Sequence, residues 1–424
     1  QDTPFLLFPP YTRNQHNSLQ LRSAVASPQL SGLSRPIAGC LQPAHSRAQT
    51  QGTLCGHNFR RFDQVHLTRQ WPELGSLQII DTLELSLLAF ALEPSHRLQK
   101  DYKLSDYASN DPLEDVRATR LLLEQCLKNL GQHPAPLRQL YTWLLTHGET
   151  TADAAYRGLF EPLGWLPEAP PTFSDLPPAV LTDLSSDALN YIWGILQREA
   201  DFDRRFIVAA LLVWNFERNQ HQSKQAPSAW LNHLPQFQDT LDQLFPVTPA
   251  GFTYQPFLEA FDIPSFQGVQ EEAVQAIITR KNPLILMPTG GGKSLCYQLP
   301  ALMYYRRQWG LTVCISPLQA LMEDQVADLE AKGLDFATYI NSTLPAELRA
   351  ERLEALRNGH KGLLYISPEQ LRSISIRSLL REHPPALWVI DEAHCISQWG
   401  QSFRPDYRYI PKFIQELYTD LNRP

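Results

Sequence analysis

Short apolar runs alternate with helical stretches in the carboxyl-terminal part of the chain. The runs read "PLILMP", "LTVCISP", "GLLYISP" and "ALWVIDEA", and helical spacing covers 267–280, 294–306, 318–332, 346–358 and 368–382. Buried strands that alternate with helices are typical of a parallel sheet with helices on both faces. The pattern therefore predicts an α/β domain over about 251–424, with ligands beyond the carboxyl ends of the strands.

The residues before this domain show different patterns. Residues 1–50 are rich in Ser, Gln and Pro and carry one acid, Asp2, which predicts disorder or a non-native leader. Over 51–130, "LQIIDTLELSLLAF" predicts a strand that continues into a helix, and "PLEDVRATRLLLEQCLKNL" has helical spacing. Helical runs broken by proline-rich stretches fill 131–250 and favour a mainly helical connector without chemistry of its own.

Composition narrows the class of protein. With 43% hydrophobic and 19% charged residues, no apolar run of membrane-spanning length and no signal pattern, the sequence predicts a cytoplasmic protein without a membrane partner. Six cysteines without a C-x-x-C pair favour reduced thiols over a disulfide framework or a zinc site. Because the net charge is −7, binding to nucleic acid would have to come from a local surface.

The stretch "TGGGKS" lies between the run "PLILMP" and a predicted helix. Consecutive backbone N–H groups of glycines can surround phosphate oxygens, and a helix N-terminus adds positive potential. The pattern predicts a phosphate loop for ATP, in which Lys293 reaches the β- and γ-phosphates and Ser294 binds Mg²⁺. The glycines are Gly290, Gly291 and Gly292, while Met287 stands where the usual motif has its first glycine. The alternative is a glycine-rich turn that caps a helix.

A second candidate for chemistry is the stretch "LWVIDEAH" at 387–394. An apolar run that ends in two acids places Asp391 at a strand tip, where it can hold Mg²⁺ through water. Glu392 is then placed to orient or deprotonate the attacking water. Taken alone, two carboxylates after a strand also suit a helix-capping pair. The phosphate loop upstream favours the catalytic interpretation.

Four stretches together resemble the first motor domain of RecQ-type DNA helicases, in superfamily two. They read "MPTGGGKSLCYQLPA", "ISPLQALMEDQV", "LLYISPEQL" and "DEAHCISQWGQSFRPDY", and the resemblance covers about 252–424. It implies a RecA-like P-loop NTPase domain that uses ATP and Mg²⁺ to unwind DNA in the 3′–5′ direction in repair or recombination. The implied partners are single-stranded and forked duplex DNA, in a nucleoid or a nucleus. Since that family carries a second motor domain with an arginine finger, we expect this chain to be a fragment.

The resemblance also implies roles for individual residues. The stretch "FDIPSFQGVQEEAV" looks like the adenine-reading motif, with Gln270 as base contact and Gln267 where the family usually has arginine. The remaining residues implied at the nucleotide are Phe266 and Thr289. The residues implied along one DNA strand are Ser316, Pro317, Leu318 and Gln325.

An aromatic-rich loop follows the acids, "SQWGQSFRPDY". Trp399 and Phe403 can stack on unpaired bases, and Arg404 adds positive charge. By resemblance the loop senses DNA, and His394 links it to the nucleotide site. Gln401 and Ser402 replace the usual His-Asp of the family, which suggests weaker coupling and, as an alternative function, a nucleotide- and DNA-binding module without turnover.

A second resemblance concerns residues 51–130. "GHNFRRFDQVHL" and "NDPLEDVRAT" resemble the second and third motifs of DEDD-type 3′–5′ exonucleases, of ribonuclease H-like fold, and imply metal ligation by Asp63 and Asp115. Asn110 replaces the general base of that family, and an amide cannot take a proton from water near neutral pH. Residues 1–62 hold no D-x-E motif. We interpret the segment as a truncated or decayed exonuclease domain, with an ordinary helical cap as the alternative.

Overall fold

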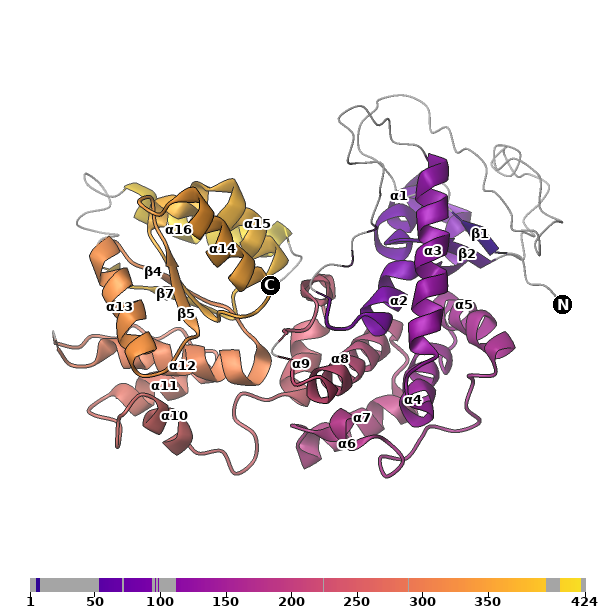
Figure 1. The fold of residues 1–424 in the computed structure, drawn as a ribbon, viewed down its shortest axis with the longest axis horizontal. Coiled ribbons are helices and arrows are strands. Elements are labelled where there is room, and N and C mark those ends of the chain that lie inside the picture. The colour runs from indigo at the N-terminus through magenta and orange to yellow at the C-terminus, as the bar shows by residue number, and fades with distance from the viewer. Residues whose placement is uncertain are drawn as a thin grey trace. The chain divides into compact units, whose positions relative to one another are not determined.

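The computed structural model describes residues 5–7, 53–70, 72–93, 96, 98, 112–223, 225–288, 290–393 and 405–420. The chain divides into two compact units (Figure 1). The N-terminal unit holds Gln1–Thr182 and Trp193–His221, and the C-terminal unit holds Asp183–Ile192 and Gln222–Pro424. The expected connector over 131–250 is therefore not a unit of its own, because part of it packs within each unit.

A small parallel sheet lies in the N-terminal unit. Its strands β1 (Phe5–Leu7), β2 (Thr53–Gly56) and β3 (Gln78–Asp81) pair in the order β1-β2-β3. Phe5–Leu7 form a strand that pairs in register with Thr53–Cys55, which differs from the disorder expected there; the alternative of a non-native leader stays a prediction. The predicted strand that continues into a helix is confirmed, since α2 (Thr82–Ala89) begins directly after β3.

Helices make up the rest of the N-terminal unit. They are η3 (Phe59–Asp63), α1 (Gln64–Gln70), η4 (Pro72–Ser76), α3 (Pro112–Leu130), α4 (Ala135–Thr146), α5 (Thr151–Phe160), η6 (Glu161–Leu163), α6 (Pro178–Leu181), α7 (Ser186–Arg198) and α8 (Phe202–Gln220). Every residue of α8 from Arg205 to Phe216 is buried. A helix that is apolar around its circumference belongs inside a core, so α8 forms the centre of this unit. The unit boundary at Ile192 divides α7 between the two units.

The C-terminal unit contains the predicted α/β domain. Its elements are η7 (Ala229–His233), α9 (Phe237–Leu244), α10 (Gln255–Ala260), α11 (Gln270–Ile278), α12 (Lys293–Gln308), β4 (Thr312–Ile315), α13 (Gln319–Ala331), β5 (Ala337–Ile340), α14 (Ala346–Arg357), β6 (Leu363–Ile366), η8 (Pro368–Arg372), α15 (Ile374–Glu382), β7 (Leu387–Ile390), η10 (Pro405–Arg408) and α16 (Tyr409–Asp420). The strands form one parallel sheet in the order β5-β6-β4-β7.

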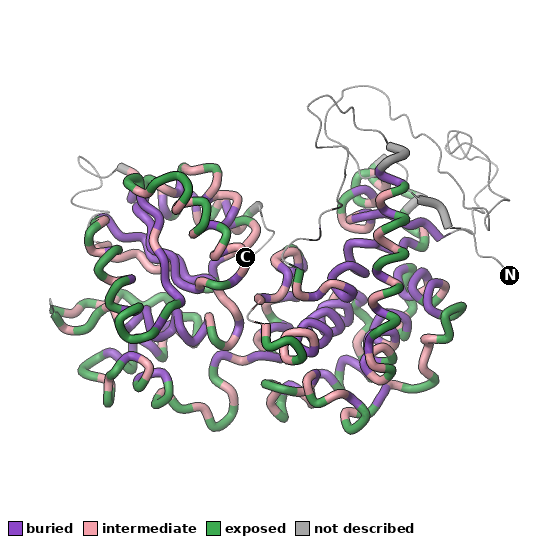
Figure 2. The backbone as a smooth tube through the Cα atoms, viewed as in Figure 1, coloured by how far each residue is buried: buried purple, intermediate pink, exposed green. Residues whose placement is uncertain are grey.

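Helices cover both faces of this sheet, as the sequence pattern predicts. Alternate strand residues face opposite ways: Leu363 and Tyr365 pack with residues of α10 to α13, while Leu364 and Ile366 pack with residues of α14 to α16. In Figure 2 the tube of this sheet is mostly buried, and many residues of the surrounding helices are exposed. Burial on both faces explains why strands β4 and β6 are largely apolar runs.

The run "PLILMP" at 283–288 is not a strand, contrary to the prediction. Leu284 and Leu286 are 77% and 82% exposed. Strand β7 lies at the edge of the sheet, and its side chains are only half-buried. A strand needs a neighbour for its N–H and C=O groups, and the ladders among the described strands give 283–288 no such neighbour.

Residues 222–250 support the carboxyl end of α12. The buried amide of Gln308 donates from Nε2 to Asp242 Oδ1 at 2.7 Å and to the carbonyl oxygen of Phe245 at 3.0 Å. The ring of Phe245 meets Trp309 edge to face, with centroids 5.6 Å apart. An ion pair between Arg280 and Asp242 joins the end of α11 to the same point. These residues thus belong to the α/β domain, although the sequence assigned them to the connector.

Candidate functional site

The phosphate loop has the backbone that its glycines permit. Gly290 and Gly292 both have φ of +76°, in the left-handed region, which costs glycine little and other residues more. The N–H of Gly291 donates to the carbonyl oxygen of Pro288 at 3.1 Å, and α12 begins immediately after Gly292. Gly292 has no side chain to cap the helix, and the N–H of Leu295 donates to the carbonyl oxygen of Gly292 at 3.2 Å. The N–H groups of Lys293 and Ser294 can therefore face an anion.

Gln270 joins this loop to helix α11. Its side chain is 4% exposed. Oε1 accepts the N–H of Gln267 at 2.8 Å, and Nε2 donates to the carbonyl oxygen of Gly292 at 3.3 Å. A Cβ added to Gly292 would lie 2.5 Å from that Nε2, so the glycine allows the close approach. The base contact implied for Gln270 stays a prediction, while the structure places its amide against the phosphate loop.

Asp391 lies at the carboxyl end of β7, where the sheet pattern predicts ligands. Its backbone N–H donates to the carbonyl oxygen of Ile315 at 2.9 Å, and its own carbonyl oxygen accepts a hydrogen bond from the hydroxyl of Tyr407 at 3.1 Å. Its carboxylate accepts the hydroxyl of Ser316 at 3.3 Å and the N–H of Glu392 at 3.0 Å. Hydrogen bonds therefore fix the position of Asp391 on both its backbone and its side chain.

Charges around Asp391 connect the two predicted motifs. Burial raises the pKa of Asp391 above its usual value, the charge of Glu392 raises it further, and the ammonium of Lys293 opposes both effects. Lys293, at the start of α12, has the smallest of these effects on the pKa of Asp391. Glu392 has φ of +49°, a conformation that costs a non-glycine residue energy and that often marks functional sites.

The other predicted site residues fall into two groups. Of those described, Ser294 is the second residue of α12, Phe266 packs edge to face on Tyr254, Pro317 is buried, Leu318 is 50% exposed and Gln325 is half-buried. Pro317 and Leu318 lie between β4 and α13. The residues outside the described part of the chain are Thr289, His394, Trp399, Gln401, Ser402, Phe403 and Arg404.

Sequence reasoning missed polar residues that support the site. Tyr407, which is fully buried, holds the backbone of Asp391, and Gln298 on α12 hydrogen-bonds both Gln325 and Tyr365. A sequence signal exists for Gln298, a lone amide within the apolar stretch "LCYQLPALM". Buried amides need partners, so this position indicates an internal hydrogen bond but not its partners.

The described part of the exonuclease-like segment holds a third buried acid, Asp81, besides the two predicted. Asp63 ends η3 and Asp115 lies in α3, and both are buried. Asp81, at the end of β3, accepts the N–H groups of Asn58 at 2.7 Å, Leu83 at 3.0 Å and Arg60 at 3.1 Å. Among the described residues, no group of three or more His, Cys, Asp or Glu side chains could hold a metal ion. Asn110 lies outside the described residues.

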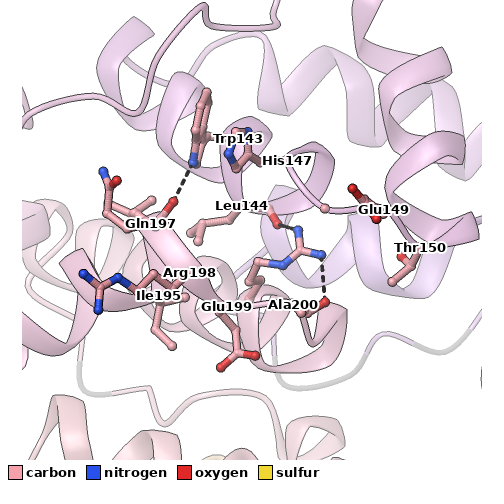
Figure 3. A pocket seen from close by; sticks show the side chains of 13 residues that line it. Trp143, Leu144, His147, Glu149, Thr150, Ile195, Gln197, Arg198, Glu199 and Ala200 are labelled. Atoms are coloured by element: carbon pink, nitrogen blue, oxygen red, sulfur yellow. Dashed lines mark hydrogen bonds between the residues drawn. The ribbon is translucent and has the colours of Figure 1, made fainter.

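A cavity of about 440 Å³ lies in the N-terminal unit between the ends of α4 and α7 (Figure 3). Several of its polar groups hydrogen-bond to backbone carbonyl oxygens of the same unit. Trp143 donates from Nε1 to the carbonyl oxygen of Leu196 at 3.0 Å, and His147 stacks on its ring. Arg205 donates to the carbonyl oxygen of Leu144 at 2.6 Å. None of the predicted site residues lines this cavity.

Within the described ranges, no helix is both long enough and apolar enough to span a bilayer.

Residues 267–421 match the family model of the DEAD/DEAH box helicases. Over 159 residues the chain is 48% identical to ATP-dependent DNA helicase RecQ of Bacillus subtilis. The match covers 37% of this chain and 26% of that protein. It is 43% identical over 164 residues to the probable ATP-dependent DNA helicase RecS of the same organism, covering 38% of this chain and 32% of the relative. A third relative is ATP-dependent helicase SGS1 of Saccharomyces cerevisiae, which is 44% identical over 168 residues. The match covers 38% of this chain and 12% of that protein.

The fold, the site and these matches agree on a class. Residues 267–421 form a DEAD/DEAH box helicase domain with a RecA-like parallel sheet. Over this domain the chain is similar to RecQ and RecS at 48% and 43% identity. The chain spans only about a third or less of the length of these relatives. The family match begins at residue 267, so the exonuclease-like interpretation of 51–130 stays a hypothesis.

Proposed function

We propose that the C-terminal unit is the ATP-binding half of a RecQ-type 3′–5′ DNA helicase, which uses ATP hydrolysis to move along DNA. One observation carries the proposal: Asp391, at the end of β7, accepts a hydrogen bond from Ser316, which follows the neighbouring strand β4, in the same unit as the phosphate loop before α12. The names of the relatives, ATP-dependent DNA helicases, support the choice of nucleotide and polymer.

The residues present fit MgATP. The free N–H groups at the start of α12 and the glycine backbone suit phosphate oxygens, and Lys293 would neutralise the β- and γ-phosphates. Ser294 and Asp391 would hold Mg²⁺, which neutralises charge on the phosphates when bound. Glu392 would orient the attacking water and accept its proton. Ser316 and Tyr407 would keep Asp391 in place during turnover.

The proposed DNA surface consists of two residues that follow β4, the buried Pro317 and the half-exposed Leu318, and of the half-buried Gln325 on α13. Pro317, Leu318 and Gln325 would lie along one strand of single-stranded or forked duplex DNA, in repair or recombination. Because the chain has a net charge of −7, we expect these local contacts to carry the binding rather than a general positive field. The site of action would be the compartment that holds DNA, a bacterial nucleoid or a nucleus.

A second candidate is a nucleotide- and DNA-binding module without turnover. It is favoured by Gln401 and Ser402, which replace the usual His-Asp of the aromatic-rich loop. Hydrolysis separates the two candidates. ATP hydrolysis that Glu392→Gln abolishes supports the motor, whereas nucleotide binding without hydrolysis, with or without single-stranded DNA, supports the module for this chain.

Titration with a fluorescent ATP analogue tests the nucleotide site. We expect Lys293→Ala to weaken binding of the Mg²⁺ complex by about tenfold or more, because charge-assisted contacts to phosphate contribute about 1.5–3 kcal/mol. Lys281→Ala is the matched control, since Lys281 is an exposed lysine of the same unit. Equal affinity of Lys293→Ala and the parent chain would refute the assignment.

A further inference from the structure

The side-chain amide of Gln298 connects three elements of the C-terminal unit. Gln298 lies on α12 and is 7% exposed. Its Nε2 donates to Oε1 of Gln325 on α13 at 2.8 Å and to the hydroxyl oxygen of Tyr365 on β6 at 2.9 Å. Both hydrogens of this amide nitrogen are therefore used, and both point into the protein.

Tyr365 accepts one hydrogen of this amide. It is 1% exposed, and the ring of Tyr297 meets it edge to face, with centroids 6.4 Å apart. Burial raises the pKa of Tyr365 well above its usual value, so the hydroxyl stays neutral at physiological pH. A rigid, neutral hydroxyl that accepts one hydrogen of Gln298 leaves the other hydrogen for Gln325.

The consequence concerns which end of Gln325 faces outward. Its Oε1 is occupied by Gln298. Its Nε2 has no hydrogen-bond partner in the described part of the chain and is not among the buried unpaired polar atoms. The half-buried side chain thus presents two N–H donors to solvent. Phosphate oxygens accept hydrogen bonds and cannot donate them, so this orientation suits a nucleic-acid backbone.

We propose that Gln298 is a positioning residue that holds the amide of Gln325 with its N–H donors outward, so that α13 donates to a DNA phosphate. The proposal rests on the proposed function, because it assumes that α13 faces DNA. According to this proposal, Gln298 on α12 influences DNA binding only through its hydrogen bond to Gln325. A purely structural hydrogen bond in the core would affect stability without depending on Gln325.

A double-mutant cycle on the full chain tests this dependence. The probe is a fluorescein-labelled oligothymidylate, followed by anisotropy at one fixed salt concentration. We expect Gln325→Met to weaken binding about tenfold, as loss of a hydrogen bond to a charged acceptor does. Gln298→Met should weaken it about threefold to tenfold, and the double variant should bind no more weakly than Gln325→Met. Two results would overturn the proposal. In the first, Gln298→Met binds the oligonucleotide as tightly as the parent does. In the second, Gln298→Met weakens binding by the same factor in the parent and in the Gln325→Met variant.

A second variant tests the outward donors without touching the core. Gln325→Glu keeps an oxygen for Gln298 but turns a carboxylate oxygen toward the phosphate, so its loss should exceed that of Gln325→Met. Binding by Gln325→Glu as tight as that of the parent would also overturn the proposal. Affinity for a fluorescent ATP analogue and the thermal midpoint serve as folding controls. A parent chain that does not bind the oligonucleotide would count against the DNA contact in the proposed function as well.

Discussion

The substitution Gly292→Ala tests how the phosphate loop is held. Two costs follow from the structure. A residue with a Cβ at φ of +76° loses about 1–2 kcal/mol in the left-handed region. The new Cβ would also lie 2.5 Å from Nε2 of Gln270, so this buried amide must move and break its bonds to Gly292 and Gln267. At about 1 kcal/mol for a neutral hydrogen bond, the second cost is about 1–2 kcal/mol.

Gly290→Ala is the matched control. Gly290 has the same φ of +76°, but among the described residues nothing lies within 4 Å of its added Cβ. It should therefore carry the conformational cost alone. The double variant Gly292→Ala with Gln270→Ala removes the clash, and it should not reproduce the full sum of the two single effects.

Differential scanning calorimetry of the full chain measures these effects. Because ligands shift the transition of the unit that binds them, the transition that MgATP raises in the parent identifies the C-terminal unit. At about 2–4 °C per kcal/mol for a unit of this size, we expect Gly292→Ala to melt about 2–8 °C below Gly290→Ala. Equal midpoints for the two variants would refute the reasoning about Gln270.

Two further predictions concern the N-terminal unit. Burial raises the pKa of Asp81 from 3.8 to about 7, so the folded unit holds this proton more tightly than the unfolded chain, and stability is lost as pH rises through that range. Relative to Asp81→Asn, the parent should lose about 3 kcal/mol of unfolding free energy between about pH 5 and about pH 8. The comparison with this variant cancels the opposite effect of His96, whose pKa burial lowers to about 4. A difference in unfolding free energy between parent and variant that stays constant with pH would contradict the prediction. Secondly, 3′-labelled single-stranded DNA should stay full length with Mg²⁺ or Mn²⁺, since Asn110 cannot act as a base; shortening that Asp115→Ala abolishes would show an active exonuclease.

The sequence predicts the α/β domain well because burial on both faces makes strands β4 and β6 largely apolar runs. The sequence pattern does not predict strand β5, because its residues "ATYI" begin with alanine and include two polar side chains. The run "PLILMP" fails in the opposite direction. It has the composition of a strand, but strand formation depends on a neighbour distant in sequence, which composition does not report.

The candidate site shows the same limit. The glycines, Lys293 and Asp391 are readable because each carries its chemistry in a local motif. The contact of Gln270 with Gly292, and that of Tyr407 with Asp391, join segments far apart in the chain. A single sequence shows that a polar residue lies in an apolar region, but its partner depends on the packing of helices and strands.

The contacts of residues 222–250 decide where this domain can be cut. A truncated chain that starts at residue 251, the boundary expected from the sequence, would lack Asp242 and Phe245, the partners of the Gln308 amide. Loss of these two hydrogen bonds costs about 0.5–1.5 kcal/mol each. The cut would also uncover the apolar surface that α9 and Phe245 cover around Trp309, and exposed apolar patches promote aggregation. For expression of the helicase domain by itself, residue 222 is therefore a better starting point than residue 251.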